Sequence, residues 1–140
     1  MSKLKAIIVD DERLSRVNLR RLLAPHHGIE IVAEAHSCNS AVEAIFQFKP
    51  EIIFLDIQLK GESGLDLLKI TGRRVKIVFV TALEDYMLQN FGCETVDILL
   101  KPVNHDRLKL IVNRLLKMRP EKKSTVPGSA QMNSLCLLHC

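Results

Sequence analysis

Five short apolar segments, separated by stretches with helical spacing, constrain the fold of this chain more than any other feature of its sequence. The segments are rich in β-branched side chains, which is typical of strands buried inside a sheet. They cover residues 6–9, 30–35, 52–55, 76–80 and 96–100. Because strands that alternate with helices form parallel sheets covered by those helices, we expect an α/β fold.

Amphipathic patterns between the strands predict the helices. The clearest pattern follows the last strand, where apolar residues recur at the spacing of one helical face. Its members are Leu108, Ile111, Val112, Leu115 and Leu116. Weaker patterns predict helices over residues 13–23, around 41–48, and roughly over 64–70 and 84–91. Ser40, with Glu43 three residues later, predicts a capping box at the start of the second helix.

The order of the strands follows from their polarity. The segments at 6–9, 52–55 and 76–80 are apolar without alternation, as expected for central strands that are covered on both faces. The segments at 30–35 and 96–100 contain charged residues and fit the edges of the sheet. This pattern predicts a flavodoxin-like (βα)5 doubly wound parallel sheet with the strand order 2-1-3-4-5.

A change in composition at Pro120 predicts the end of the folded domain. Residues 1–119 are expected to form one domain, which is an ordinary length for a single folded unit. Residues 120–140 begin with a polar stretch that contains Pro and Gly, which predicts a linker or tail with no domain of its own.

Composition and charge argue against several classes of function. The net charge of +4 is carried by scattered basic residues, and aromatic residues make up 4% of the chain, so a nucleic-acid-binding surface is not indicated. The four cysteines lack paired CxxC spacing, so neither a disulfide framework nor a zinc site is indicated. The sequence has no signal peptide and no apolar stretch that could span a membrane, so we expect a cytoplasmic protein.

Polar residues follow the predicted strands at the edge of the sheet where ligands of such folds bind. They are Asp10, Asp11 and Glu12 after the first strand, Asp56 after the third, Thr81 after the fourth and Lys101 after the fifth. Carboxylates this close repel one another, and burial disfavours their charged form, so solvent, a helix start or a bound cation must offset the charge. Taken singly, each of these residues also fits a helix start, a turn or the surface.

Taken together, the same residues predict a site for phosphoryl transfer. Mg²⁺ prefers carboxylate, water and phosphoryl oxygens as its ligands. An aspartate can act as the nucleophile and form an aspartyl phosphate. A lysine ammonium and Mg²⁺ supply the positive charge that phosphoryl oxygens require, and a threonine hydroxyl can donate a hydrogen bond to them. A bound cation would also offset the negative charge of the crowded carboxylates.

Four stretches of the chain occur in the order and at the spacing of a known family. They are IIVDDE, IIFLDIQLKGESGLDLL, VFVTA and ILLKPV, and through them the chain from about Lys3 to Met118 resembles the receiver domain of two-component response regulators. The resemblance implies that Asp56 accepts a phosphoryl group from a histidine kinase in a reaction that depends on Mg²⁺. It also implies a signalling domain that assists its own phosphotransfer and dephosphorylation, and not an enzyme with a separate substrate.

The resemblance further implies how the acidic residues are used. Asp10 and Asp11 correspond to the acidic pair of the family, and together with Asp56 they mark the Mg²⁺ site. The backbone carbonyl of Gln58 is implied as a further ligand of the ion. These four residues are therefore the expected metal site.

Thr81 is implied to be the switch hydroxyl and Lys101 the contact to the phosphoryl group, with a bond to Pro102 that is usually cis in the family. Two positions depart from the family pattern. Ile98 stands where an aromatic residue often pairs with the threonine in switching, and the stretch Leu59-Lys60-Gly61 lacks the Pro that commonly precedes the Gly. The first departure bears on how phosphorylation switches the conformation, and the second bears on the stiffness of the loop after Asp56. Neither changes the acidic site.

The stretches VDDERLSRVNLRRLL and DIQLKGESGLDLL are most similar to receivers of the LytR/AlgR type. In that group a LytTR DNA-binding domain usually follows the receiver, and such an output domain is absent from this chain. The resemblance implies that phosphorylation switches a surface built from the fourth helix, the fifth strand and the last helix. That surface would bind a partner or a second copy of the chain and control an output, which we expect to be transcription.

Two other functions fit part of the sequence. A Mg²⁺-dependent hydrolase could use Asp56 as its nucleophile, but Gln58 stands where such an enzyme needs a second acid, and no segment is present to cover a substrate. A pseudo-receiver that only binds partners would be locked in one state. Ile98 favours this alternative, and the complete set of site residues argues against it.

Overall fold

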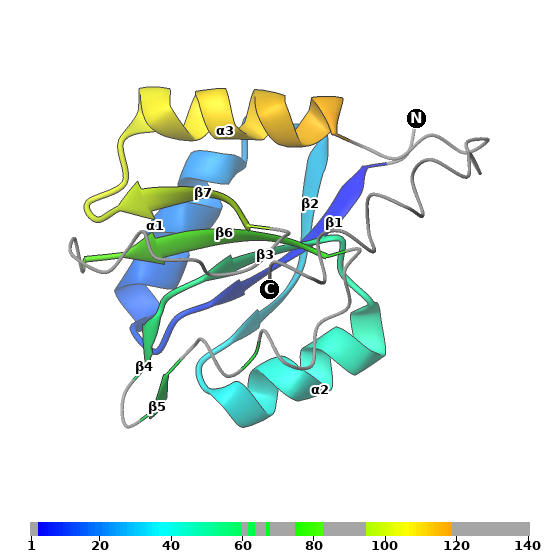
Figure 1. The fold of residues 1–140 in the computed structure, drawn as a ribbon, viewed down its shortest axis with the longest axis vertical. Helices are drawn as coiled ribbons and strands as arrows, with labels where there is room; N and C mark the ends of the chain where they lie inside the picture. Colours follow the sequence, from blue (N-terminus) through cyan, green and yellow to red (C-terminus); the bar gives the residue numbers. More distant parts are fainter. Residues whose placement is uncertain (1–2, 60–61, 64–66, 68–74, 83–94, 119–140) are drawn as a thin grey trace, which may run out of the picture.

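The computed structural model describes residues 3–59, 62–63, 67, 75–82 and 95–118. Its centre is a sheet of five parallel strands in the order β2-β1-β3-β6-β7 (Figure 1). The strands are β1 (Leu4–Val9), β2 (Ile29–Ala35), β3 (Ile52–Leu55), β6 (Lys76–Thr81) and β7 (Thr95–Leu100). Counted among these five strands alone, this is the predicted order 2-1-3-4-5, and the flavodoxin-like fold is confirmed.

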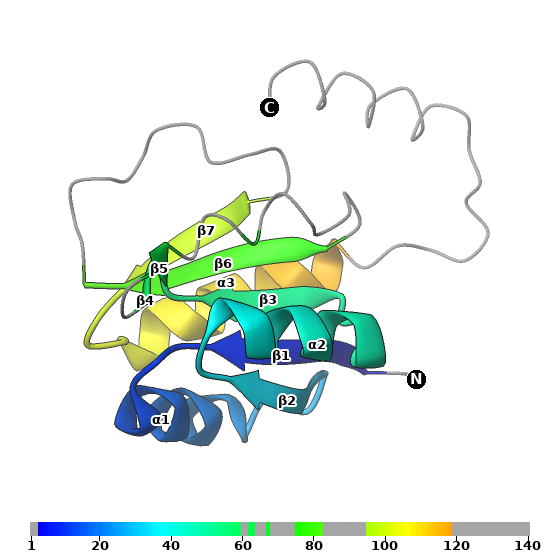
Figure 2. The same ribbon diagram turned by 90° about the horizontal axis from the view of Figure 1, so that it is seen from below.

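Helices cover both faces of the sheet. Helices α1 (Arg13–Leu23) and α3 (His105–Lys117) pack on one face, and α2 (Cys38–Phe48) packs on the other. In Figure 1, α3 lies above the sheet and α2 below it. Figure 2 shows the strands from below, with β2 and β7 at the two edges. The structure is therefore a three-layer arrangement in which the strand ends remain available for a site.

The central strands are apolar along their whole length because both rows of their side chains are buried. In β1, Ala6 and Ile8 belong to the core under α1 and α3, while Ile7 and Val9 belong to the core against α2. All four side chains are almost completely buried. Successive residues of a strand point to opposite faces, so a strand with two helical layers needs apolar residues at every position.

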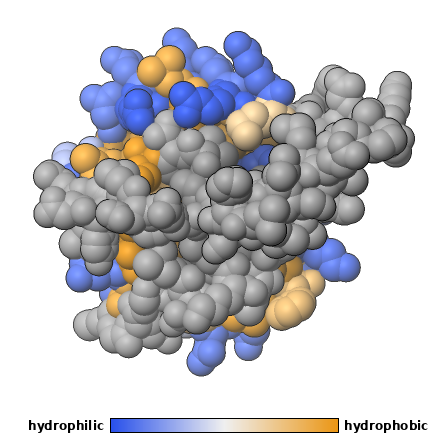
Figure 3. Space-filling view, viewed as in Figure 1, coloured by the Kyte–Doolittle hydropathy of each residue, from blue (hydrophilic) through white to orange (hydrophobic). Residues whose placement is uncertain are grey.

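Helix α3 has the predicted amphipathic pattern. Leu108, Ile111, Val112 and Leu115 are buried, and Leu116 is half-buried against the same core. The side chain of its N-cap, Asn104, accepts a hydrogen bond from the backbone N–H of Arg107 at 2.9 Å. Figure 3 shows mainly hydrophilic side chains on the outer side of α3, at the top of the view. The hydrophobic stripe thus attaches the last helix to the sheet, as its spacing indicates.

The capping box of α2 differs from the prediction. The expected cap, Ser40 with Glu43, is wrong, because the helix begins earlier and its N-cap is Ser37. The Ser37 hydroxyl accepts from the backbone N–H of Ser40 at 3.1 Å, and the Ser40 hydroxyl accepts from the N–H of Ser37 at 3.1 Å. A serine therefore takes the place that a glutamate usually has in a capping box, and Glu43 lies exposed within the helix.

Some features were not predicted, and some predictions fall outside the described residues. A short antiparallel pair, β4 (Gln58–Leu59) with β5 (Glu62–Ser63), follows β3 and was not expected. The helices predicted over 64–70 and 84–91 and the tail at 120–140 lie outside the described residues, except for position 67. Within the described part of the chain, no helix has both the length and the apolar character needed to cross a membrane.

The new capping assignment leads to a stability prediction. We expect Ser37→Ala to lower the free energy of unfolding by about 1 kcal/mol, because it removes the acceptor for the Ser40 N–H. We expect Glu43→Gln to change it by less than about 0.5 kcal/mol, as is usual at an exposed position. Urea unfolding of both variants checks the assignment. A larger loss for Glu43→Gln than for Ser37→Ala would contradict it.

Candidate functional site

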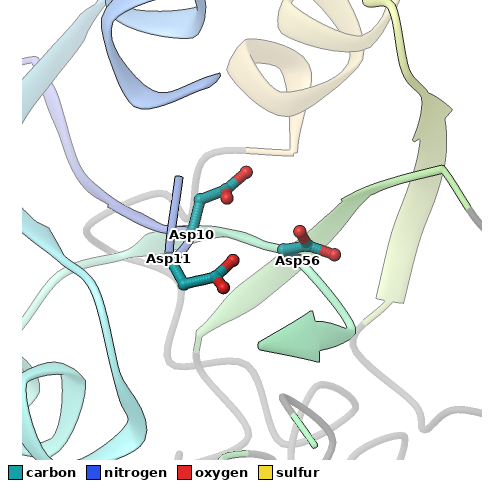
Figure 4. Close-up of side chains that lie close together, drawn as sticks. All are labelled: Asp10, Asp11 and Asp56. Carbon is teal, nitrogen blue, oxygen red and sulfur yellow. The ribbon is translucent and has the colours of Figure 1, made fainter. Parts of the chain in front are cut away.

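Asp10 and Asp56 lie close together because their strands are neighbours in register. Val9, the last residue of β1, pairs with Leu55, the last residue of β3. The backbone N–H of Asp56 also donates to the carbonyl of Val9 at 2.9 Å. Asp10 and Asp56 are buried, and Asp11 is half-buried. Oxygens of Asp10, Asp11 and Asp56 all lie within 4.8 Å of one another, so the fold assembles the predicted acidic group (Figure 4).

Lys101 brings a positive charge into the acidic group from the end of β7. Its Nζ lies 2.8 Å from Oδ2 of Asp10 and 3.0 Å from Oδ2 of Asp56. Its backbone N–H donates to the carbonyl of Thr81 at 2.9 Å, which fixes the end of β7 beside the end of β6. The bond from Lys101 to Pro102 is cis, as the sequence resemblance implied. Lys101 therefore lies with the acidic residues and not on the open surface.

All four polar groups of Asp10 have a partner. Its N–H donates to the carbonyl of Ala35 at 3.0 Å, and its Oδ1 accepts from the N–H of Glu12 at 2.9 Å. Its Oδ2 binds Lys101, and its carbonyl accepts from Nη1 of Arg16 at 2.7 Å. These contacts hold both the backbone and the carboxylate of Asp10 in place. The contact with Arg16 was not predicted, because nothing in the sequence distinguishes this arginine from others on α1.

Burial and neighbouring charges shift the pKa values of Asp56 and Lys101. The pKa of Asp56 is raised above its ordinary value, chiefly because burial disfavours the charged carboxylate, and the charge of Asp10 adds to the rise. Lys101 and the N–H of Gln58, which donates to Oδ1 at 3.0 Å, oppose the rise without cancelling it. For Lys101, burial acts to lower the pKa, but the hydrogen bonds that its ammonium donates to Asp10 and Asp56 outweigh burial and raise the pKa. Lys101 therefore keeps its positive charge, and the carboxyl group of Asp56 loses its proton at a higher pH than that of an exposed aspartate does.

The remaining predicted residues take different places. Thr81 ends β6 and is buried, and the role of its hydroxyl stays a prediction. Gln58 donates its N–H to Asp56, and the role of its carbonyl stays a prediction. Glu12 is the exposed N-cap residue of α1, so the helix-start interpretation fits this residue. Ile98 is half-buried and packs against the core that contains α2.

The group of donors fits a hard divalent cation such as Mg²⁺. Three carboxylates offer oxygen ligands of the kind that Mg²⁺ prefers, and they approach one another from the ends of two strands. The ammonium of Lys101 contributes one positive charge beside these three carboxylates. A divalent cation would add further positive charge, so Asp10, Asp11 and Asp56 are suited to hold it.

Comparisons with known proteins agree with this site. A family model described as the response regulator receiver domain matches residues 6–113. An uncharacterized response regulatory protein of Vibrio cholerae is 42% identical over 86% of this chain and 51% of its own length. The sensory transduction protein LytT of Bacillus cereus is 38% identical over 88% of this chain and 50% of its own length. The transcriptional regulatory protein BtsR of Salmonella typhi is 38% identical over 91% of this chain and 55% of its own length. The chain thus spans about half the length of the curated relatives it matches.

Solved structures show the same fold. The solution NMR structure of the PhyR response regulator REC domain of Erythrobacter litoralis has a TM-score of 0.74 at 27% identity, over 86% of this chain and 95% of that one. The response regulatory domain of the protein mrkE from Klebsiella pneumoniae has a TM-score of 0.72 at 27% identity, over 82% of this chain and 97% of that one.

The raised pKa of Asp56 leads to a prediction about stability. The folded chain keeps the Asp56 carboxyl group protonated to a higher pH than the unfolded chain does. Protonated Asp56 therefore favours the folded state, and this contribution to stability is lost as the pH rises through the raised pKa. Without divalent cations at neutral pH, Asp56→Asn should therefore stabilise the protein by about 1 kcal/mol, a usual size for a substitution that relieves a functional site. Thermal melting from acidic to neutral pH measures the effect.

The control for this measurement is Asp106→Asn, which removes an exposed carboxylate at the start of α3. It should melt within a degree or so of the parent at every pH, because exposed charges contribute little. A lower melting temperature for Asp56→Asn than for the parent at neutral pH would contradict the assignment of a destabilising buried charge.

Proposed function

Because the chain belongs to the family of response regulator receiver domains, we propose that it accepts a phosphoryl group from a histidine kinase on the carboxylate of Asp56. The family is one of phosphoacceptor signalling domains and not of hydrolases with separate substrates. The observation that carries the assignment to Asp56 is its position: it is buried at the end of β3, among Asp10, Asp11 and Lys101. Asp56 thus lies at the carboxyl ends of the strands, which is the edge where ligands of such folds bind.

The reaction is a displacement at phosphorus. A carboxylate oxygen of Asp56 attacks the phosphorus of a phosphohistidine, the bond between phosphorus and the imidazole nitrogen breaks, and the imidazole keeps the electron pair and takes up a proton. The product is an aspartyl phosphate. Bound Mg²⁺ would supply positive charge for the phosphoryl oxygens, held by Asp10, Asp11 and Asp56 with the carbonyl of Gln58.

Lys101 supplies the second positive charge of the proposed reaction. Its ammonium already lies 3.0 Å from an oxygen of Asp56, so a phosphoryl oxygen on that residue comes within its reach. Fixed positive charge at the place where negative charge develops stabilises a transition state, because it needs no rearrangement during the reaction. The second partner, Asp10, holds the ammonium at 2.8 Å and limits the positions it can adopt.

We propose that phosphorylation is passed on through Thr81 to the surface formed by β7 and α3. The end of β6 with Thr81 and the end of β7 with Lys101 are joined by a backbone hydrogen bond of 2.9 Å, so a displacement at one reaches the other. Leu100 and Leu110 are exposed on β7 and α3, which supports a role of this surface in contacts with a partner or a second copy of the chain. The residues expected to complete this surface, over 84–91, lie outside the described residues.

The output is proposed to be transcriptional control. The names of two relatives, a sensory transduction protein and a transcriptional regulatory protein, support this proposal. This chain matches about half of each, so the proposal concerns the regulatory half of such a protein. Mg²⁺ as the metal, a histidine kinase as the phosphodonor and the cytoplasm as the location are part of the same proposal.

The phosphoacceptor assignment predicts a gain in mass. After incubation with Mg²⁺ and acetyl phosphate, the intact protein should gain one labile phosphoryl group, and Asp56→Asn should gain none. Asp106→Asn, which changes an exposed aspartate, should gain the group like the parent. Mass spectrometry of the intact protein provides the measurement. An undiminished gain in Asp56→Asn would overturn the assignment.

The role of Lys101 predicts a separation between metal binding and reaction. Lys101→Ala should retain Mg²⁺ binding, because the three carboxylates remain, and should slow phosphoryl uptake about 100-fold, the usual loss when one stabilising donor is removed. Calorimetry for Mg²⁺ and the rate of mass gain measure the two effects. A loss of Mg²⁺ affinity as large as that of Asp11→Ala would contradict the assigned role.

A further inference from the structure

Arg16 connects the acidic site to the edge of the sheet. It lies in the first turn of α1, and its Nη1 donates to the backbone carbonyl of Asp10 at 2.7 Å. Its Nε lies 3.2 Å from Oε1 of Glu34, on the edge strand β2. Its side chain is 16% exposed, and its bond to the Asp10 carbonyl is partly buried, whereas its contact with Glu34 is open to solvent. One guanidinium therefore bridges the loop that carries the acidic pair and a neighbouring strand.

Glu34 is itself held in place from two sides. Its Oε2 lies 2.6 Å from Nε of Arg20, one turn further along α1 than Arg16. Burial acts to raise the pKa of Glu34, but the two guanidinium groups outweigh it and hold the pKa below its ordinary value. Glu34 therefore carries its charge at neutral pH and provides a fixed anchor for Arg16.

The hydrogen bond to the Asp10 carbonyl acts on the next residue, Asp11. The carbonyl of Asp10 and the N–H of Asp11 belong to one planar peptide unit, so a bond that fixes the carbonyl fixes the whole plane. The opposite side of Asp10 is held as well, because its N–H donates to the carbonyl of Ala35 in β2. With both ends of Asp10 held, the direction in which the chain enters Asp11 is determined. Asp11 offers one of the three carboxylates of the proposed metal site.

We propose that Arg16 is a positioning residue that orients the peptide between Asp10 and Asp11, and thereby sets the affinity of the acidic site for Mg²⁺. Glu34 anchors Arg16 through Oε1, whereas Arg20 pairs with the other oxygen, Oε2, and has no role in the proposal. The proposal rests on the proposed function for the identity of the ion. Groups that orient the ligands of a metal affect its affinity although they do not touch it.

An arginine suits this role because its guanidinium is planar and carries several donors in a fixed arrangement. Nη1 and Nε can therefore serve a carbonyl and a carboxylate at the same time. A lysine has one ammonium on a flexible stem and cannot reproduce the same two directions. Lysine at position 16 should thus retain the attraction to Glu34 and lose part of the orientation of the peptide.

The experiment compares Mg²⁺ affinity in three variants of the full chain, measured by calorimetry well below their melting temperatures. We expect Arg16→Met to weaken Mg²⁺ binding about 10-fold, as is usual for residues that orient metal ligands. Arg16→Lys should give an intermediate value. Arg20→Met is the matched control, because it removes the other guanidinium from Glu34 without touching Asp10, and it should stay within about twofold of the parent.

A second readout separates positioning from a general loss of structure. The rate of phosphoryl uptake from acetyl phosphate should reach a similar maximum in Arg16→Lys and in the parent, but at a higher concentration of Mg²⁺. Melting temperatures measured without Mg²⁺ show how much stability each variant loses. Unchanged Mg²⁺ affinity in Arg16→Met, or an equal loss in Arg20→Met, would overturn the proposal. If the parent binds Mg²⁺ but takes up no phosphoryl group, the proposed function fails, and the calorimetric comparison still decides the role of Arg16.

Discussion

The ammonium of Lys101 lies between the carboxylates of Asp10 and Asp56 and connects the ends of three strands that are far apart in the sequence. Two buried carboxylates this close would repel each other strongly without a positive charge between them. The ammonium also explains why burial alone does not decide the charge of the site, because its attraction opposes the rise in the pKa of Asp56. The site is therefore assembled around the two ion pairs that Lys101 makes with Asp10 and Asp56.

The sheet makes this arrangement possible because it fixes where each strand ends. Val9 and Leu55 are paired across β1 and β3, and Thr81 and Leu100 are paired across β6 and β7. Asp10, Asp56 and Lys101, which follow Val9, Leu55 and Leu100, therefore come to the same edge of the sheet as Thr81. Central strands buried on both faces cannot slip by one residue without turning their apolar side chains to the wrong layer. The register of the strands is therefore what brings the acidic group together.

The sequence predicted these features to different degrees, for physical reasons. The five strands of the parallel sheet and α3 were predictable because their apolar patterns result directly from burial, and the predicted pattern of α3 includes all four of its buried residues. The set of polar residues at the strand ends was predictable because parallel strands bring their carboxyl ends to one edge. The capping box at Ser37 was missed because the choice between two nearby serines depends on backbone dihedral angles. Arg16 was missed because its role depends on a contact with a backbone carbonyl, which leaves no trace in the pattern of residue types.

The measurement that tests the central claim most directly is the chemical mapping of the phosphorylated residue. An aspartyl phosphate is reduced by borohydride to the alcohol, which marks the modified position as homoserine in a peptide map. After reaction with Mg²⁺ and acetyl phosphate, the account predicts this mark at position 56 and its absence when Mg²⁺ is removed. A mark at Asp10 or Asp11, or an equal yield at position 56 without a divalent cation, would contradict the account.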